Sequence, residues 1–225
     1  MDHDCIIIGF VGIDQYDIIL YLARSLSHLK KKVMLVDKAD TGALTACIPC
    51  PAGMGEVIID YRGVYYLNSG DYKELVREGI EARDFQYVLI DYGYSLSEEE
   101  AAGLNQIIYA TDLQKHNVDR LIPLAAYQNN KKKLVIRDVV GYRYRPEYIR
   151  NELGSVEIPA EDTHIIYLDE VDTKCKLKCQ YEIAFSFRKL SVPARNTVKG
   201  LLAGIIPGGN SKALATAYRK AEKGD

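Results

Sequence analysis

The sequence predicts a single α/β domain built on a mostly parallel sheet with helices on both faces. Strand-like and helix-like segments alternate along most of the 225 residues, as they do when crossover helices join parallel strands. Three segments, 5–11 (CIIIGFV), 32–37 (KVMLVD) and 87–93 (YVLIDYG), are nearly continuous apolar runs, which is typical of strands covered on both faces. No change in composition marks a boundary, so we expect one domain over residues 1–225.

The first third of the chain is expected to run strand, helix, strand. Apolar residues after the strand at 5–11 recur at the spacing of one helix face, which predicts a helix over 17–30; they are Ile18, Ile19, Leu22, Leu26 and Leu29. The strand at 32–37 leads into a loop or short helix that reaches residue 55. Two short strands, 56–60 (EVIID) and 63–68 (GVYYLN), are expected as in a hairpin. Asp71 is a favourable N-cap for a helix over 71–84.

The rest of the chain continues the alternation and then becomes less regular. Strands are predicted at 87–93, 106–112 and 132–140, with helices at 97–105, 116–128 and 146–154. Two further strands are predicted at 164–170 (HIIYLDE) and 181–187 (YEIAFSF). Two helices near 191–205 and 210–223 close the predicted fold, so C-terminal helices occupy about 191–223.

Composition and charge argue against a nucleic-acid-binding, a secreted or a membrane-spanning protein. The 29 basic and 31 acidic residues give a formal net charge of −2, which does not favour nonspecific nucleic-acid binding. The first ten residues, MDHDCIIIGF, lack the basic start and long apolar stretch of a signal peptide. Five cysteines without such a signal are expected to be reduced thiols, and no apolar window approaches the ~18 residues of a transmembrane helix. We therefore expect a cytoplasmic protein.

The stretch 6–26 (IIIGFVGIDQYDIILYLARSL) joins a buried-looking strand to a helix through a glycine-containing turn. Phosphate-binding loops are built in this way, because a helix N-terminus offers unpaired N–H groups and a positive dipole end. Asp37 follows the second strand in DKADTGALT (37–45), and Asp91 ends the apolar run of YVLIDYG. In parallel sheets, ligands bind beyond the carboxyl ends of the strands.

In these sequence segments and in the order of its elements, the chain from residue 5 to about 205 resembles the MinD/ParA family of P-loop ATPases, the deviant Walker A group. The resemblance implies a P-loop NTPase fold. Aligning YLA (21–23) with the family's NLA places FVGIDQYD (10–17) under the loop KGGVGKTT. DKADTGALT matches the family string DLDPQGNLT at four positions, which are Asp37, Gly42, Leu44 and Thr45. Asp91 matches the Walker B acid.

The same alignment implies that the hydrolytic groups are missing. Gln15 stands at the Walker lysine, Tyr16 at the hydroxyl that holds Mg²⁺, and Asp14 at the glycine before the lysine. Glutamine carries no charge to oppose a phosphoryl group, and Asp14 adds a carboxylate where phosphates would lie. Phe10 stands at the signature lysine that reaches across a dimer. Asp17 ends the loop.

Four residues of the pattern survive, namely Gly9, Gly12, Asp37 and Asp91. Glycines also permit tight turns, and acids at strand ends also cap helices, so a purely structural role stays open for each. The aspartate that orients the attacking water in the family falls at Ala39, with Asp40 one residue away. The candidate site is therefore a degenerate phosphate loop at 9–17 with Asp37, Asp40 and Asp91 beside it, and no catalytic residue is assigned.

The favoured function is a non-hydrolysing MinD/ParA-like protein that binds protein partners as a scaffold or positioning component, in settings such as pilus or secretion assembly or partition. No cofactor is expected, although weak binding of ATP, ADP or an anion at the loop is allowed. The alternatives are a nucleotide-binding switch and a genuine ATPase with a rearranged loop in which Asp40 or another residue replaces the lost groups. A homodimer, if formed, is expected not to depend on ATP, with an apolar contact near Phe10 as one option.

Other candidates carry weaker signals. CIPC (47–50) and CKLKC (175–179) have zinc-like spacings, but about 125 residues separate them and the fold gives no reason to bring them together. The four histidines, His3, His28, His116 and His164, show no ligand spacing. The lysine runs at 30–32 and 131–133 are expected to be solvated. The last predicted helix lacks the bulky apolar face of a membrane-binding helix, so we expect it to pack on the domain.

Overall fold

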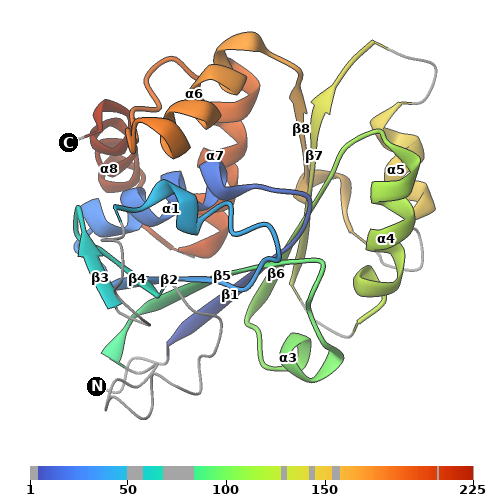
Figure 1. Cartoon of the computed structure of the whole chain (residues 1–225), viewed down its shortest axis with the longest axis horizontal. Helices are drawn as coiled ribbons and strands as arrows, with labels where there is room; N and C mark the ends of the chain where they lie inside the picture. The colour runs from blue at the N-terminus through green and yellow to red at the C-terminus, as the bar shows by residue number, and fades with distance from the viewer. Residues whose placement is uncertain are drawn as a thin grey trace.

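The strands form one eight-stranded sheet in the order β3-β4-β2-β5-β1-β6-β7-β8 (Figure 1). The computed structural model describes residues 5–49, 58–67, 84–127, 131–141, 145–153, 158–206 and 208–224. The strands are β1 (Ile6–Gly12), β2 (Val33–Asp37), β3 (Ile58–Tyr61), β4 (Val64–Leu67), β5 (Tyr87–Gly93), β6 (Gln106–Thr111), β7 (Lys132–Val139) and β8 (Thr163–Tyr167). All neighbours pair in parallel except β3 and β4, which form the expected antiparallel hairpin.

Helices cover both faces of this sheet, as the sequence predicts (Figure 1). One face carries α1 (Tyr16–His28), α6 (Glu170–Tyr181), α7 (Val192–Ile205) and α8 (Ser211–Lys223), and the other carries α3 (Glu98–Ala102), α4 (Lys115–Ala125) and α5 (Pro146–Glu152). Strand side chains alternate between the two cores: Leu35 faces the first, whereas Met34 and Val36 face the second. Strands buried on both faces therefore need the continuous apolar runs seen in the sequence.

Side-chain caps fix where several helices begin. Ser97 and Glu100 form a capping box at α3, and the Asp169 carboxylate accepts hydrogen bonds from the backbone N–H groups of Val171 and Asp172 at α6. Asn210 accepts two such bonds at the start of α8. Each cap satisfies N–H groups that have no partner inside the helix.

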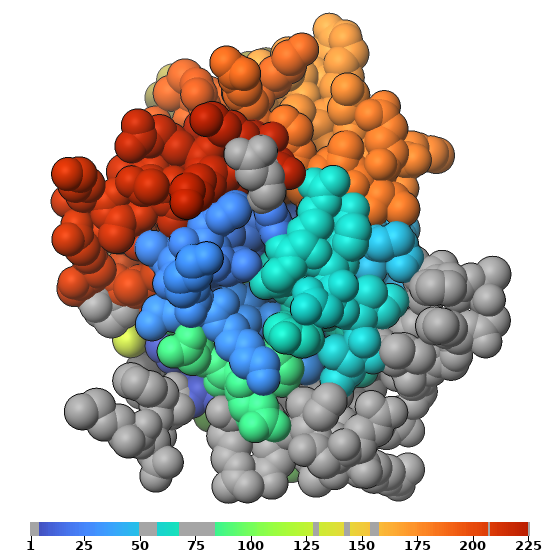
Figure 2. All heavy atoms as spheres, turned by 90° about the vertical axis from the view of Figure 1, so that its left-hand side faces the viewer, coloured from blue at the N-terminus to red at the C-terminus, as the bar shows by residue number. Residues whose placement is uncertain are grey.

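The last helix, α8, packs on α1, and Figure 2 shows the two side by side next to the β3–β4 hairpin. Tyr21 of α1 is fully buried between two aromatic rings, with centroids 4.3 Å from Phe187 and 4.9 Å from Tyr218 of α8. Arg62 of the hairpin donates to the carbonyl of Gly224 at 3.1 Å. The expected packing of this helix on the domain is confirmed.

Two predictions for the last third were wrong. Helix α6 runs from Glu170 to Tyr181, through a segment between two predicted strands for which the sequence pattern gave no helix. Residues 182–190 contain no strand, although Phe185 and Phe187 are buried in the core beside α1. The alternating apolar residues of this irregular segment therefore match the sequence pattern of a strand without forming one. The predicted helix at 71–84 lies almost wholly outside the described residues.

Strand β1 is central, paired with β5 on one side and β6 on the other, as expected from its apolar sequence. It ends at Gly12, whose backbone has φ 115°. A Cβ atom at this position would lie 2.0 Å from the carbonyl oxygen of Ala110 on β6. The next residue, Ile13, donates its N–H to that same oxygen at 3.1 Å. Only glycine allows the chain to leave the sheet here and enter α1.

We expect Gly12→Ala to lower the free energy of unfolding by at least about 2 kcal/mol, because the new methyl group meets backbone and the left-handed φ is strained. Urea unfolding followed by circular dichroism measures this. Gly141→Ala is the matched control, since nothing lies within 4 Å of a Cβ there and its φ is ordinary. Equal stability of the two variants would contradict the tight exit from β1.

Candidate functional site

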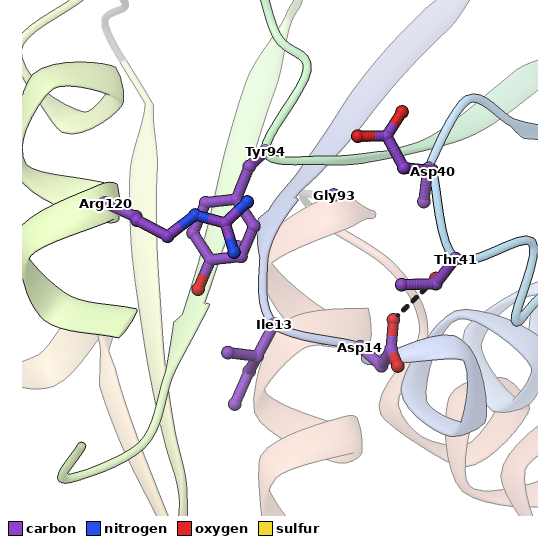
Figure 3. Close-up of a pocket in the computed structure, with 9 residues that line it drawn as sticks. Ile13, Asp14, Asp40, Thr41, Gly93, Tyr94 and Arg120 are labelled. Atoms are coloured by element: carbon purple, nitrogen blue, oxygen red, sulfur yellow. Dashed lines mark hydrogen bonds between the residues drawn. The ribbon is translucent and has the colours of Figure 1, made fainter. Parts of the chain in front are cut away.

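A pocket of about 220 Å³ lies beyond the carboxyl ends of the central strands (Figure 3). Its walls come from the segments after β1, β2 and β5 and from α4. The lining residues are Gly12, Ile13, Asp14, Ala39, Asp40, Thr41, Gly93, Tyr94 and Arg120. This edge is where parallel α/β sheets bind ligands.

One wall of the pocket is an arginine stacked on a tyrosine. The Arg120 guanidinium lies 3.7 Å from the centre of the Tyr94 ring, within the range of a cation–π contact. The Tyr94 hydroxyl donates to the Asn117 side chain at 3.3 Å, and the Asn117 amide donates to Asp112 at 3.0 Å. This chain of contacts holds the ring in place beneath the guanidinium.

The other wall carries two acids. Asp14, in the loop between β1 and α1, accepts a hydrogen bond from the Thr41 hydroxyl at 2.8 Å. Asp40 follows β2 and lines the same pocket. Figure 3 shows both acids across the pocket from Arg120. The site therefore has a cationic and an anionic side.

The two residues that the alignment places at the Walker lysine and hydroxyl do not line this pocket. Gln15 is buried, and its amide lies 3.4 Å from the Ile108 carbonyl of β6, to which it donates. The Tyr16 hydroxyl donates to the Lys176 carbonyl of α6 at 3.2 Å, and burial raises the pKa of this hydroxyl. Both side chains are used in packing at the start of α1.

Beneath the loop, Asp17 and Arg137 form a buried ion pair. Two parallel hydrogen bonds of 2.9 Å join the guanidinium to the carboxylate, and the same guanidinium donates to the Asp14 carbonyl at 3.0 Å. Burial opposes ionisation of Asp17, but the charge and hydrogen bonds of Arg137 outweigh it and hold the pKa of Asp17 below its ordinary value. The alternation of β7 places Arg137 on the α1 face, with Val135.

Asp37, at the end of β2, organises the segment that follows it. One carboxylate oxygen accepts the Ala39 N–H at 3.1 Å, and the other accepts the N–H and hydroxyl of Thr45 at 2.7 and 2.8 Å. These bonds fold residues 38–45 into a turn that carries Asp40 to the pocket. Asp37 thus has the capping role that the sequence left open for it.

Asp91, at the end of β5, is a buried acid beside Asp37 in the sheet register. One of its oxygens accepts the Gly93 N–H at 3.1 Å, and the other has no hydrogen-bond partner among the described residues. Burial, reinforced by the charges of Asp37 and Asp14, raises the pKa of Asp91 to about 7. The Gly93 hydrogen bond acts in the opposite direction and is outweighed.

Gly9 and Phe10 lie inside the sheet. A Cβ atom on Gly9 would come within 2.5 Å of Leu104, and Phe10 is fully buried in the core on the α1 face. The Phe10 ring itself therefore cannot make the apolar dimer contact that was expected near it, because the ring is not at the surface. Three residues escaped the sequence analysis: Tyr94, Arg120 and Arg137. Of these, only Arg137 had a signal, as a charge inside the apolar strand 132–140.

The two cysteine motifs lie closer together than expected. Cys47 and Cys179 are both buried, and helix α6 packs on the short 3-10 helix η1 (Thr45–Cys47). Burial raises the pKa of the Cys47 thiol, and Cys179 raises it further. Cys50 is outside the described residues. Among the residues that the structure describes, no three His, Cys, Asp or Glu side chains gather as a metal site.

In the described ranges, no helix has the length and apolar character needed to span a bilayer.

No family model matches the chain, and no curated protein matches it in sequence. Solved structures do match along nearly the whole chain. A chain of the MinC:MinD cell division complex of Aquifex aeolicus is 13% identical and covers 92% of this chain and 99% of its own length, with a TM-score of 0.63. A ParA family ATPase from Chlorobium tepidum TLS is 14% identical, with 96% and 98% covered and a TM-score of 0.56.

The ATP complex of a Cyanothece McdA variant is also similar, at 11% identity, with 93% of this chain and all of the other covered and a TM-score of 0.59. Identities this low show the fold alone. The chain therefore has a MinD/ParA-like P-loop NTPase fold, as its sequence predicted. The roles of the individual loop residues remain predictions.

We expect Arg137→Gln to lower the free energy of unfolding by about 3 kcal/mol, because it leaves Asp17 buried without its partner. The double variant Asp17→Asn with Arg137→Gln should lose less than the two single changes together. Urea unfolding of all four proteins measures this. Lys174→Gln, which breaks an exposed pair with Glu170, is the control and should change little. Strict additivity would contradict the ion pair.

We expect Asp91 to make stability depend on pH. Its native pKa of about 7 lies above the ordinary 3.8, so the native state keeps a proton that the unfolded chain releases. The free energy of unfolding should therefore fall as pH rises between these two values, by about 1.4 kcal/mol for each pH unit, and should be level above them.

The variant Asp91→Asn should lack this fall. Its stability relative to the unchanged chain should thus be greater at about pH 8 than at about pH 4, by more than about 1 kcal/mol. Asp60→Asn, at an exposed position on β3, is the control. A pH profile that Asp91→Asn leaves unchanged would show that the carboxyl group is ionised throughout.

Proposed function

We propose that this protein is a MinD/ParA-like P-loop protein that does not hydrolyse ATP and acts by binding protein partners, as a scaffold or positioning component. The proposed loss of ATP hydrolysis rests on one observation. At the positions of the Walker lysine and the magnesium hydroxyl, the Gln15 amide nitrogen donates to the Ile108 carbonyl and the Tyr16 hydroxyl donates to the Lys176 carbonyl. The Gln15 side-chain oxygen is buried and has no hydrogen-bond partner among the described residues. Neither side chain lines the pocket in which phosphates would lie.

The charges of the pocket support the same conclusion. A triphosphate needs cationic groups and Mg²⁺ to balance its charge in the transition state. Here the loop presents Asp14, and the neighbouring turn presents Asp40. Arg120 is the one cation that lines the described pocket, and it lies on the opposite wall. Two carboxylates beside the loop would repel a polyphosphate.

The binding of partners is proposed from the relatives. The similar structures are named as a MinC:MinD cell division complex, a ParA family ATPase and McdA. Of these, MinD is seen with a protein partner. A fold that keeps its architecture while losing its phosphate chemistry still offers surfaces for such contacts. Partition, or the assembly of a pilus or secretion system, is the kind of setting we propose.

We further propose that self-association, where it occurs, is independent of ATP, because neither the loop nor Phe10 supplies a cation to bridge two nucleotides. Multi-angle light scattering with and without Mg-ATP should give the same mass. A shift from monomer to dimer on addition of Mg-ATP would contradict this and would favour the nucleotide-switch alternative.

We expect Mg-ATP to bind with a Kd weaker than about 1 mM and not to be hydrolysed. The missing lysine–phosphate contact alone is worth roughly 1.5–3 kcal/mol, or about ten- to a hundredfold in affinity. Isothermal calorimetry and phosphate release measure the two quantities. Micromolar binding would show a functional nucleotide site, and turnover sensitive to Asp91→Asn would show an ATPase.

The double variant Asp14→Gly with Gln15→Lys tests the path of the loop. If the backbone keeps the course of a phosphate loop, this variant should bind Mg-ATP at least about tenfold more tightly than the unchanged chain. Asp14→Gly alone is the matched control, since it removes the repulsion without restoring the cation. No gain in the double variant would mean that the backbone path itself has changed.

A further inference from the structure

We propose that the pocket beyond β1, β2 and β5 binds a small zwitterion of the α-amino acid class, with the carboxylate on Arg120 and the ammonium between Asp14 and Asp40. The inference rests on the proposed loss of Mg-ATP binding at this site and goes beyond it by naming a ligand. Three observations carry it: the size of the pocket, the arginine wall and the acidic wall.

The pocket has the size of a free amino acid. Its volume is about 220 Å³, below the range of about 300–1,000 Å³ of pockets that take drug-sized ligands. Ile13 and Ala39 give its lining an apolar part. An aliphatic side chain of modest size suits such walls.

Arg120 is prepared to bind a carboxylate. Among the described residues, the stacking on the Tyr94 ring is the one polar or ring interaction of Arg120, and its N–H groups have no hydrogen bond or ion pair there. A planar guanidinium matches the two oxygens of a carboxylate, and stacking on an aromatic ring fixes its plane. The bonds from Tyr94 to Asn117 and from Asn117 to Asp112 hold that ring before any ligand arrives.

Asp14 and Asp40 supply the complementary charge. One oxygen of Asp14 accepts the Thr41 hydroxyl, and the other has no bonded partner in the described part of the chain. Asp40 likewise has no hydrogen bond or ion pair with a described residue. Both lie across the pocket from Arg120 (Figure 3). An ammonium group has three donors for such acceptors.

The pairing of opposite walls selects a class of ligand. A phosphate or sulfate would gain Arg120 but would be repelled by two carboxylates, and a simple amine would gain the carboxylates but be repelled by Arg120. A zwitterion meets both walls with opposite charges. The arrangement therefore favours a ligand that carries an ammonium and a carboxylate on one small frame.

Isothermal calorimetry on the full chain tests this with L-leucine first and then the other common free amino acids. At least one should bind with a saturable Kd below about 1 mM. For that amino acid, the amide lacks the carboxylate and the N-acetyl derivative lacks the ammonium. Each derivative should bind at least about tenfold more weakly.

Variants on both walls assign the contacts. Arg120→Gln should weaken the amino acid at least about tenfold and remove its advantage over the amide, and Asp40→Asn should reduce its advantage over the N-acetyl derivative. Lys115→Gln, also exposed on α4 but outside this pocket, is the control and should bind normally. Unchanged melting temperatures establish that the exposed variants fold.

The failures are distinguishable. If neither Mg-ATP nor any amino acid binds, the zwitterion proposal is overturned while the proposed loss of nucleotide chemistry stands. If Mg-ATP binds at micromolar concentration, both are overturned. Equal binding of an amino acid and its amide would show a plain amine site, and inorganic phosphate binding that depends on Arg120 would show an anion site. Either result also overturns the proposal.

Discussion

The buried pair of Asp17 and Arg137 joins two parts of the chain that are 120 residues apart. A charge enclosed in a protein interior must be met by an opposite charge and hydrogen bonds, so the first turn of α1 and the end of β7 have to lie where this contact requires. The same guanidinium holds the Asp14 carbonyl. The backbone from the end of β1 into α1 is thereby fixed from below by one side chain.

This anchoring decides which way the neighbouring side chains face. Asp17 is directed to β7, Gln15 to the backbone of β6 and Tyr16 to α6. Of these four consecutive residues, only Asp14 is left to face the pocket. The loop between β1 and α1 thus presents a carboxylate to the pocket. This polarity follows from the internal packing of the three residues after Asp14.

The fold was largely readable from the sequence because strands buried on both faces need continuous apolar runs, and 5–11 and 87–93 supplied them. Helix α6 could not be predicted, because it has few apolar residues and the lysines and acids among them hide any amphipathic pattern. Only the acidic wall of the pocket could be predicted from the sequence. Asp14 and Asp40 follow predicted strands, whereas Arg120 reaches the site from the surface of α4, and nothing in its local sequence marks an exposed arginine as a wall of a pocket.

The aromatic stack around Tyr21 has a consequence for how the protein is made. Its partners, Phe187 and Tyr218, are separated from it by most of the chain. During synthesis at about 5–20 residues per second, the ring therefore stays uncovered for many seconds after α1 has left the ribosome. Contacts this distant in sequence form late and slow the folding of a domain. The nascent chain therefore cannot complete the cover of this face of α1 until Phe187 and Tyr218 have been synthesised.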